Sequence, residues 1–484
     1  MRMCTLVKPR WLQVWPVATI IAAGLILLGF AMAAAFTAVA ISSDRHVVVG
    51  SMTVAISLIV SGGAYLAACM AIRRPLRRWV WFWVAAIGMV CRLALLPVPT
   101  MHETDCNRYL WDGMVWVHGY NPWQYSPAAA LNAKTSGLPS GLHQLAVKNR
   151  QLVDRINHNR LPTIYPPVSE AVFAVAAWIA PASIVSLKLM LMIFDIGMAF
   201  LVWLTLRRLK LPRIWLLFYW WNPIVIDSFA LQAHLDSITI FFVMLFFFLL
   251  VCGRRLPAAV ALGLAVAAKF WPMVLLLVLL RADLKRPWRA ARSLLISVAA
   301  AAVALAPMFT IGSSAYVSLS AYGRYWQINT LIFHLLFRFW RHFTATWDVA
   351  HLAAAATVVL IYLCIAPLLL RRAATGRQLV CAGLYLTGFI FLLGPTAFPW
   401  YYTWLVPALA ITPRPSWLIW SCTLGLYHVC FQYPEVVWFE HLPVIILLLL
   451  EAFVPAISGF FDVTLRDSPI DRSAHGRDVP GVSG

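Results

Sequence analysis

Residues 79–113, WVWFWVAAIGMVCRLALLPVPTMHETDCNRYLWDG, join an apolar run to a dense group of charges. The run 79–98 has the roughly 20 apolar residues that a helix needs to cross a bilayer. Five ionisable side chains follow it among aromatic ones: His102, Glu103, Asp105, Arg108 and Asp112. Charged groups at membrane depth are costly and mark functional sites by default. The stretch therefore predicts a membrane helix that ends at a functional site.

The composition indicates a membrane protein. The chain has 484 residues, of which 62% are hydrophobic and 12% charged, and its mean hydropathy is +0.80. Soluble domains carry about 25% charged residues. The first apolar run, 15–42, is far longer than a signal-peptide core and lacks a clear cleavage site. We therefore expect an all-α polytopic membrane protein whose first run is a membrane helix.

The formal net charge of +20 does not indicate nucleic-acid binding, because the cations stand in short clusters between apolar runs. The clusters are RRPLRR (73–78), RRLKLPR (207–213), GRR (253–255), RADLKRPWRAAR (281–292) and RRAATGR (371–377). Short basic loops orient membrane helices with the positive side in the cytoplasm. This pattern predicts that both termini are cytoplasmic and that the loop after residue 98 faces outward. The nine cysteines show no CxxC spacing and are expected as buried free thiols.

Hydropathy and the basic clusters together predict about 14 spans. Twelve are single crossings: 15–42, 49–72, 79–98, 184–206, 213–231, 236–252, 291–310, 347–370, 378–394, 399–411, 416–433 and 440–460. Residues 256–281 are expected as a hairpin with Lys269 near its tip, since one crossing there would move 281–292 to the outer face. Within the long outer loop 99–183, residues 140–158 predict an interfacial helix. The proline-bounded run 166–181 predicts an interfacial or re-entrant segment.

The expected outer segments share acids, arginines and aromatic residues. They are 99–127, 227–236 with Asp227, His234 and Asp236, 311–346 with Arg324, Arg338 and Arg341, and 395–404. An aromatic belt with snorkelling arginines accounts for the aromatics but poorly for the acids. An acid can accept the proton of an attacking hydroxyl, and a cationic loop can stabilise a departing phosphate. Since the chain has no P-loop, GxGxxG or DxD pair, a nucleotide-dependent enzyme is not expected.

Several motifs resemble those of bacterial GT-C glycosyltransferases that use polyprenyl-phosphate sugars. These enzymes are often mannosyltransferases and are distantly similar to the mannosyltransferases of GPI-anchor assembly. The motifs are D-x-x-R-Y-L-W-D-G (105–113), G-x-N-P-x-x-Y-x-P (119–127), P-T-I-Y-P-P (162–167), W-N-P (221–223), A-H-L-D (233–236), A-K-F-W-P (268–272), Y-W-Q-I-N (325–329) and P-W-Y-Y-T-W-L-V-P (399–407). One departure is Phe398, where the related pattern often has His before P-W-Y.

The resemblance implies a GT-C-like bundle of about 12–14 transmembrane helices, in which Asp105 is the catalytic base and Glu103 the reserve candidate. It implies a polyprenyl-phosphate sugar donor, with mannose favoured, and a glycan or lipid-linked acceptor. The active site would face outward from a bacterial inner membrane. The module would span 79–460, after an N-terminal tail with two additional spans (1–78) and before a disordered cytoplasmic tail (461–484). Some members need a divalent cation and others do not, so metal dependence stays open.

Residues expected to bind substrate lie in the expected outer segments, in the rest of the loop 99–183 and near the tip of the hairpin 256–281. They are Arg108, Tyr109, Asp112, Asn121, Tyr165, His234, Asp236, Lys269, Arg324, Asn329, Trp400 and Tyr401. Arg108 suits either an ion pair with Asp105 or Glu103, or a phosphate. Asp112 is expected as a helix-terminal acid and Asn121 as the Asn of an N-P turn.

Three further interpretations concern ionisable groups near membrane depth. Lys269 needs an anionic partner in lipid, such as a lipid phosphate, unless it snorkels to the interface. His234 and Asp236 suit either acceptor orientation or metal binding, although a lone His/Asp pair is a poor metal signature. Asp195 is expected as a buried hydrogen-bonding group between helices, and Arg92 as a side chain that snorkels or meets a phosphate.

Two other classes of protein remain as alternatives. A secondary transporter or a flippase of lipid-linked sugars predicts ionisable residues near mid-membrane, whereas most lie at the expected outer edge. A non-catalytic scaffold would explain neither Asp105 nor the outer arginines. The sequence therefore favours an enzyme whose partners are a sugar donor, an acceptor and membrane lipid, without nucleic acid.

Overall fold

The computed structural model describes residues 11–40, 47–72, 76, 78–101, 103–309, 314–454 and 457. Within these ranges the elements are helices, with one isolated bridge between Ile328 and Thr396. The predicted all-α class is confirmed. The expectations for His102, for the cluster at 73–75 and 77, for the chain before residue 11 and for the tail 461–484 fall outside the described residues.

Eight helices in the described ranges are long and apolar enough to cross a membrane. They are α1 (Trp11–Ala40), α2 (Val47–Ala71), α3 (Arg78–Leu95), α9 (Ile184–Arg208), α15 (Pro287–Phe309), α18 (Trp347–Leu370), α19 (Gly376–Leu393) and α24 (Val436–Phe453). A ninth span is bent by 56°. It consists of η2 (Arg213–Leu216), α10 (Leu217–Trp220), α11 (Pro223–Ile226) and η3 (Asp227–Leu231). The protein is thus a multi-pass membrane protein.

Five of the predicted crossings are shorter or broken helices instead. Residues 236–252 form α12 (Asp236–Val251), and the hairpin comprises α13 (Arg255–Ala268), η4 (Trp271–Leu275) and α14 (Leu276–Ala282). The runs 399–411 and 416–433 form only short turns, α20 (Pro399–Tyr402), α21 (Val406–Leu409), α22 (Pro415–Leu418), α23 (Trp420–Thr423) and η5 (Leu424–Val429). Pro399, Pro407 and Pro415 each lack a backbone donor, which interrupts a continuous helix. By length, the structure therefore supports eight or nine spans rather than about 14.

The expected hairpin at 256–281 is present. At its base, the Arg255 side chain lies 3.4 Å from the Asp283 carboxylate and donates to the Ala282 carbonyl. The start of α13 and the end of α14 are therefore neighbours. Lys269 lies at the opposite end, in extended backbone between the two arms.

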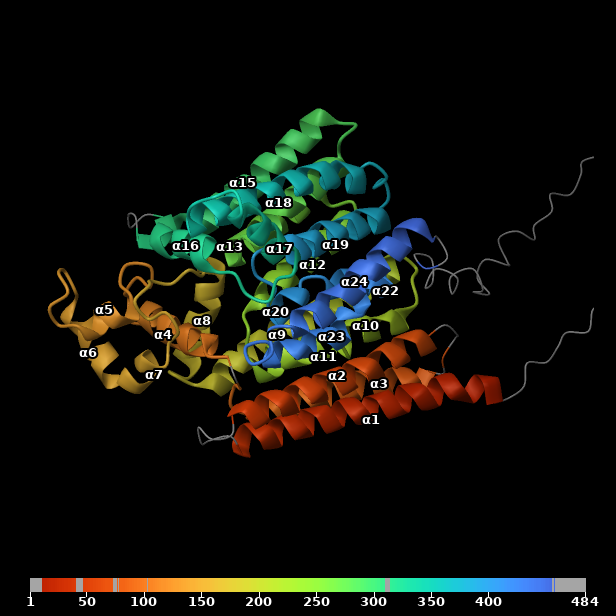
Figure 1. Cartoon of the computed structure of the whole chain (residues 1–484), viewed down its shortest axis with the longest axis horizontal. Helices are drawn as coiled ribbons and strands as arrows, with labels where there is room; N and C mark the ends of the chain where they lie inside the picture. Colours follow the sequence, from red (N-terminus) through yellow and green to blue (C-terminus); the bar gives the residue numbers. More distant parts are fainter. Residues whose placement is uncertain are drawn as a thin grey trace, which may run out of the picture.

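The long loop 99–183 folds into five helices that we call the α4–α8 module. They are α4 (Asp105–Val117), α5 (Pro127–Leu131), α6 (Ser140–Lys148), α7 (Arg150–Asp154) and α8 (Pro167–Ile179). Figure 1 shows this module at one end of the molecule, with α1–α3 along one edge and α15 and α18 along the other. The expected helix at 140–158 is divided into α6 and α7. The expected loop 311–346 contains α16 (Ser314–Tyr325) and α17 (Ile332–Arg341).

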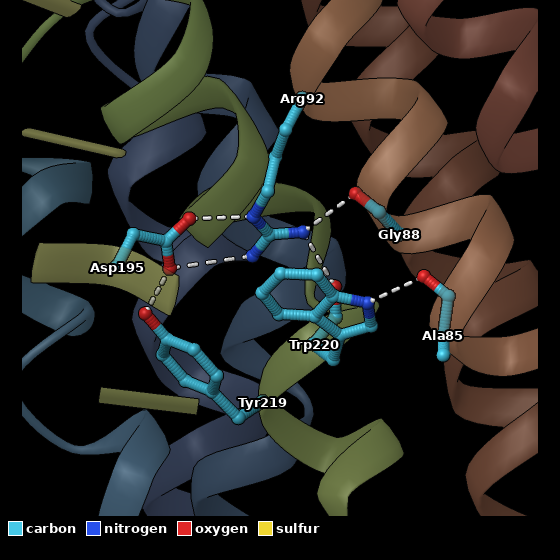
Figure 2. A network of polar contacts seen from close by, with 6 residues as sticks. All are labelled: Ala85, Gly88, Arg92, Asp195, Tyr219 and Trp220. Atoms are coloured by element: carbon cyan, nitrogen blue, oxygen red, sulfur yellow. Dashed lines mark hydrogen bonds and ion pairs between the residues drawn. The ribbon is translucent and has the colours of Figure 1, made fainter. Parts of the chain in front are cut away.

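A buried ion pair fastens α3 to α9 (Figure 2). Arg92 Nε lies 2.5 Å from the Asp195 carboxylate, which also accepts the hydroxyl of Tyr219. The guanidinium donates to the carbonyl oxygens of Gly88 (3.0 Å) and Trp220 (2.9 Å). Asp195 is thus the buried hydrogen-bonding group that the sequence predicted. The prediction that Arg92 snorkels or meets a phosphate is wrong, because its side chain is fully buried against Asp195.

Candidate active site

Asp105 is the first residue of α4 and lies half-buried at the edge of the α4–α8 module. Burial raises the pKa of its carboxyl above the usual value, while the charges of Lys269 and Arg108 lower it and that of Asp236 raises it. These electrostatic neighbours come from the tip of the hairpin and from the start of α12. The structure therefore brings together Asp105, Lys269 and Asp236, which are far apart in the sequence.

Lys269 and Asp236 form an ion pair beside Asp105. Lys269 Nζ lies 2.7 Å from Asp236 Oδ1, and the Trp404 indole N–H donates to the same oxygen at 2.5 Å. The ammonium also lies 4.3 Å from the ring centroid of Tyr401. The anionic partner of Lys269 in this structure is therefore Asp236. The sequence had suggested a lipid phosphate as one such partner, or else a side chain that snorkels to the interface.

The link between the bent span and α12 has unusual backbone geometry. Asp227–Leu231 is a π-helical turn, and Ala233 has a left-handed φ of 59°. Gln232 fastens the turn, since its amide donates to Asp227 at 3.3 Å and accepts from the Met101 N–H at 3.0 Å. π-turns and non-glycine residues at positive φ are enriched at functional sites. This geometry places His234 and Asp236 next to the start of the α4–α8 module.

His234 lies at one end of an aromatic stack. Its ring is 3.8 Å from that of Trp400, which stacks at 4.4 Å on Phe398. Both ring nitrogens are buried and have no hydrogen-bond partner among the described residues. Burial, with the nearby charges of Lys269 and His428, lowers the pKa of His234 well below its usual value. His234 is therefore a neutral imidazole with one free donor and one free acceptor.

Glu103 accepts a hydrogen bond from the Tyr427 hydroxyl at 3.2 Å. Burial and the charge of Asp105 raise the pKa of Glu103 to about 8. At neutral pH its carboxyl is therefore mostly protonated. The acid that the sequence named as a reserve base is thus better suited to donate a hydrogen bond than to accept a proton.

Tyrosines and Asn329 line the other side of this group. The Tyr401 hydroxyl lies 2.9 Å from that of Tyr322, which lies 3.0 Å from the Thr396 hydroxyl. Asn329, with φ of 52°, donates to the Ala397 carbonyl at 2.9 Å, and its own amide oxygen is buried without a partner in the part of the chain described.

Five residues expected to bind substrate instead organise the α4–α8 module. Arg108 donates to the carbonyl oxygens of Leu161 (3.1 Å) and His158 (3.0 Å). One expectation was an ion pair with Asp105 or Glu103, and these backbone hydrogen bonds are found instead. Asp112 lies inside α4, not at a helix end as predicted. Burial raises the pKa of Asp112 to about 6, against the charge of Arg108.

The remaining three stabilise turns and packing. Asn121 accepts the Trp123 N–H at 2.9 Å, in the turn that the sequence predicted. Tyr109 stacks on Phe173 of α8 at 4.6 Å, and Tyr165 meets Tyr109 edge-on at 5.0 Å. Tyr165 also interacts electrostatically with Asp105, so it borders the group around that residue.

The arginines of 311–346 do not join this group. Arg324 forms an exposed ion pair with Asp348, at the start of α18, with Nε 3.0 Å from the carboxylate. Arg338 is exposed on α17, and Arg341 donates to the Thr344 carbonyl. The expectation that Arg324 contributes to a phosphate-binding loop therefore lacks support in this structure.

A divalent cation has no evident ligand set here. In the described ranges, no three His, Cys, Asp or Glu side chains gather closely enough to hold a metal ion. His234 stacks on Trp400, and Asp236 is paired with Lys269. Among the described residues, this donor set thus does not fit the metal-binding alternative.

Sequence reasoning missed some members of the site. Trp404 lies in the P-W-Y-Y-T-W-L-V-P motif and could have been identified there. Gln232 lies within the expected outer link. Tyr322 and Tyr427 carry no motif signal, because their role arises only from contacts with Tyr401 and Glu103.

The multi-pass helical architecture and a family match together support an integral-membrane glycosyltransferase of GT-C type. The matching model is that of glycosyltransferase family 87, over residues 163–399. No curated protein and no solved structure matches the chain. The matched range contains His234, Asp236 and Lys269 and begins after α4. A glycosyltransferase acts on a sugar donor and an acceptor.

Proposed function

We propose that the protein transfers a sugar, with mannose favoured, from a polyprenyl-phosphate donor to a hydroxyl of a glycan or lipid-linked acceptor. Transfer would take place on the outer face of a bacterial inner membrane, with both termini in the cytoplasm. The observation that carries the proposal is the position of Asp105 beside the Lys269–Asp236 pair. A proton acceptor and a cation then lie together at the edge of a membrane protein.

The reaction is a direct displacement with inversion. The Asp105 carboxylate accepts the proton of the acceptor hydroxyl while that oxygen attacks the anomeric carbon. The bond between the anomeric carbon and the phosphate oxygen breaks, and its electron pair leaves with the lipid phosphate. A raised pKa suits this role, because a general base is most effective when its pKa lies near the working pH.

Lys269 stabilises the leaving phosphate. An ammonium has three donors, and in Lys269 one of them is directed to Asp236. The other two N–H donors of Lys269 can stabilise the negative charge that develops on the phosphate, and this stabilisation is strong in a site of low dielectric. Asp236 and Trp404 hold the cation in place between turnovers.

His234 and the aromatic stack suit the binding of a sugar. A neutral imidazole offers one donor and one acceptor to hydroxyl groups, and both nitrogens of His234 are otherwise unpartnered in the described structure. Trp400, which stacks on both His234 and Phe398, holds the imidazole in place. Leaving buried polar atoms unsatisfied costs free energy, which a bound sugar would recover.

A carrier of lipid-linked sugars is the alternative. It would require ionisable groups near mid-membrane that are free to change partners. Asp195 was the main residue of this kind, but it is engaged with Arg92 and Tyr219. The enzyme is therefore the better supported of the two.

The experiment is transfer in vitro with purified protein, radiolabelled polyprenyl-phosphate mannose and a membrane-glycan extract. Asp105→Asn keeps the size of the side chain but removes the base, and we expect transfer to fall by about 10²–10⁴-fold. Asp154→Asn, an exposed acid of α7, is the matched control. Transfer by Asp105→Asn at the rate of the control would disprove the assignment of the base. Movement of donor across liposomes without transfer of any polyprenyl-phosphate sugar would favour the carrier.

A further inference from the structure

A cavity of about 630 Å³ adjoins α4. Cys106, Asn107 and Leu110 of α4 line it, together with residues of α6, α7 and the link into α9. Successive residues of an α-helix are about 100° apart, so Asn107 and Leu110 point roughly 160° and 140° away from Asp105. The opposite side of α4 packs on α8 through Tyr109 and Phe173. The cavity is therefore distinct from the candidate active site.

The lining of this cavity is cationic. Lys148, Arg150 and Arg155 line it, and its lining contains no acidic residue. Arg150 pairs loosely with Asp154 at 3.5 Å, whereas Lys148 and Arg155 have no carboxylate within ion-pair distance in the described part of the chain. Amide side chains add neutral donors: Asn107, Asn149 and Gln151. Such a lining favours an anion with several acceptor oxygens, such as a phosphate.

One end of the cavity meets the membrane-spanning helices. Pro99 follows α3 and Ile184 begins α9, and both residues line the cavity. The two helices are fastened here because Lys188 Nζ, on α9, donates to the Val98 carbonyl at 2.7 Å. Each of these helices exposes apolar side chains further along. Leu93 of α3 is 49% exposed, and Leu189 of α9 is 40% exposed.

We propose that this cavity binds the phosphate-bearing headgroup of an anionic membrane phospholipid, whose acyl chains lie along α3 and α9. Cations near an anionic lipid surface contribute to its binding, and apolar helix surfaces accommodate the chains. The bound headgroup bridges α6 and α7 to the ends of α3 and α9. It thereby supports the back of α4, on whose first turn Asp105 stands. The lipid is a structural ligand and not a substrate.

The test compares lipid retention by full-length protein taken from nanodiscs of phosphatidylcholine with or without phosphatidylglycerol. Native mass spectrometry counts the lipids that remain bound. We expect wild type to retain phosphatidylglycerol in preference to phosphatidylcholine. The double variant Lys148→Gln, Arg155→Gln should lose about fivefold in retention per cation removed, which corresponds to about 1 kcal/mol for each. Lys134→Gln, Arg160→Gln, at exposed positions of the same module outside the cavity, is the matched control.

A second arm separates a lipid from a free anion. Inorganic phosphate in excess should leave the retained phosphatidylglycerol in place, because it lacks the acyl chains. Displacement of the lipid by inorganic phosphate would overturn the proposal in favour of a soluble anion. Equal retention of both lipids by wild type, or equal loss in the cavity variant and its control, would also overturn it. No sugar transfer is measured, so the result is independent of the role of Asp105.

Discussion

Among the described residues, the Arg92–Asp195 and Lys269–Asp236 ion pairs differ in how fully their groups are bonded. In the Arg92–Asp195 pair the side chains are 0% and 2% exposed, and the guanidinium also reaches two carbonyl oxygens (Figure 2). In the Lys269–Asp236 pair the lysine side chain is 18% exposed. Its remaining donors face aromatic rings rather than hydrogen-bonding oxygens in the described structure.

The difference separates structure from function. A charged side chain whose hydrogen-bonding groups are all paired within the protein has none left to bind a ligand. Such a side chain instead holds together the helices that it connects. Lys269 retains bonding capacity, and the neighbouring His234 has two unpartnered ring nitrogens in the described ranges. Five variants test this distinction, in decreasing order of expected effect.

The largest effect is expected from Arg92→Met, on stability. Removing one partner of a buried ion pair leaves an uncompensated charge on Asp195, which costs about 3–5 kcal/mol. The free energy of unfolding, measured by denaturant titration in detergent, should fall by that amount. Arg208→Met, an exposed position at the other end of α9, is the matched control.

The double variant Arg92→Met, Asp195→Leu sharpens this test. Replacing a whole buried pair by apolar residues is often neutral or stabilising, so most of the lost stability should return. Specific transfer activity per folded molecule should equal that of wild type. Loss of activity in a stable double variant would give the pair a functional role and erase the contrast with Lys269.

Lys269→Gln should act mainly on activity, because the Gln amide can still donate a hydrogen bond to the buried Asp236 carboxylate. Removing a preorganised group that stabilises transition-state charge costs about 10²–10³-fold in kcat. Lys285→Gln, at an exposed position after α14, is the matched control. Kinetics at saturating donor, together with a melting curve, measure both quantities. A Lys269→Gln protein that unfolds early but turns over normally would make this pair structural as well.

The pH dependence of transfer should reveal the charges around Asp105. The base must be ionised, so activity is lost as pH falls through its pKa, which burial raises above the usual Asp value. Lys269 lowers that pKa and Asp236 raises it. In Lys269→Gln the acidic limb should therefore move to higher pH, and in Asp236→Asn to lower pH. Rate profiles of the residual activity measure the shifts, and shifts of the same sign in both variants would contradict this electrostatic arrangement.

The smallest effect is expected from Glu103→Gln at neutral pH. Because burial and Asp105 raise the pKa of Glu103 to about 8, its carboxyl is mostly neutral already. Gln preserves that neutrality, so the rate should fall by about fivefold at most, the value of one hydrogen bond of about 1 kcal/mol. A loss as large as that of Asp105→Asn would make Glu103 the base.

Hydropathy predicted the long helices well but not the interrupted ones. The runs that form α1, α2, α9 and α18 are predominantly apolar over a full crossing, and burial in lipid requires them to be helical. The segments 399–411 and 416–433 are equally apolar, yet they fold into short turns packed among aromatic residues of the core. Apolar content alone cannot distinguish the two cases, because both remove the same surface from water.

The sequence predicted which residues belong to the site better than which residues pair with one another. The motifs identified Asp105, Asp236 and Lys269, and the structure places them together. The partner of Lys269 could not be inferred, since Asp236 lies 33 residues earlier in the chain and only the hairpin brings the two together. The partner of Arg324 could not be inferred either, because Asp348 lies in the first turn of α18, beyond the intervening helix α17. Local sequence describes each residue's chemistry but not which distant side chain neutralises it.

The hairpin of α13 and α14 has a consequence for topology. A hairpin enters and leaves the membrane on the same side, so it does not change the orientation of the helices that follow. Residues 251 and 287 therefore lie on one side of the membrane. The depth of the hairpin can therefore change without inverting any later helix. Shortening both arms by one turn would withdraw Lys269 from Asp236 by about 5 Å while the remaining spans keep their orientation. The chain can thus vary the position of its cation independently of the membrane topology that supports it.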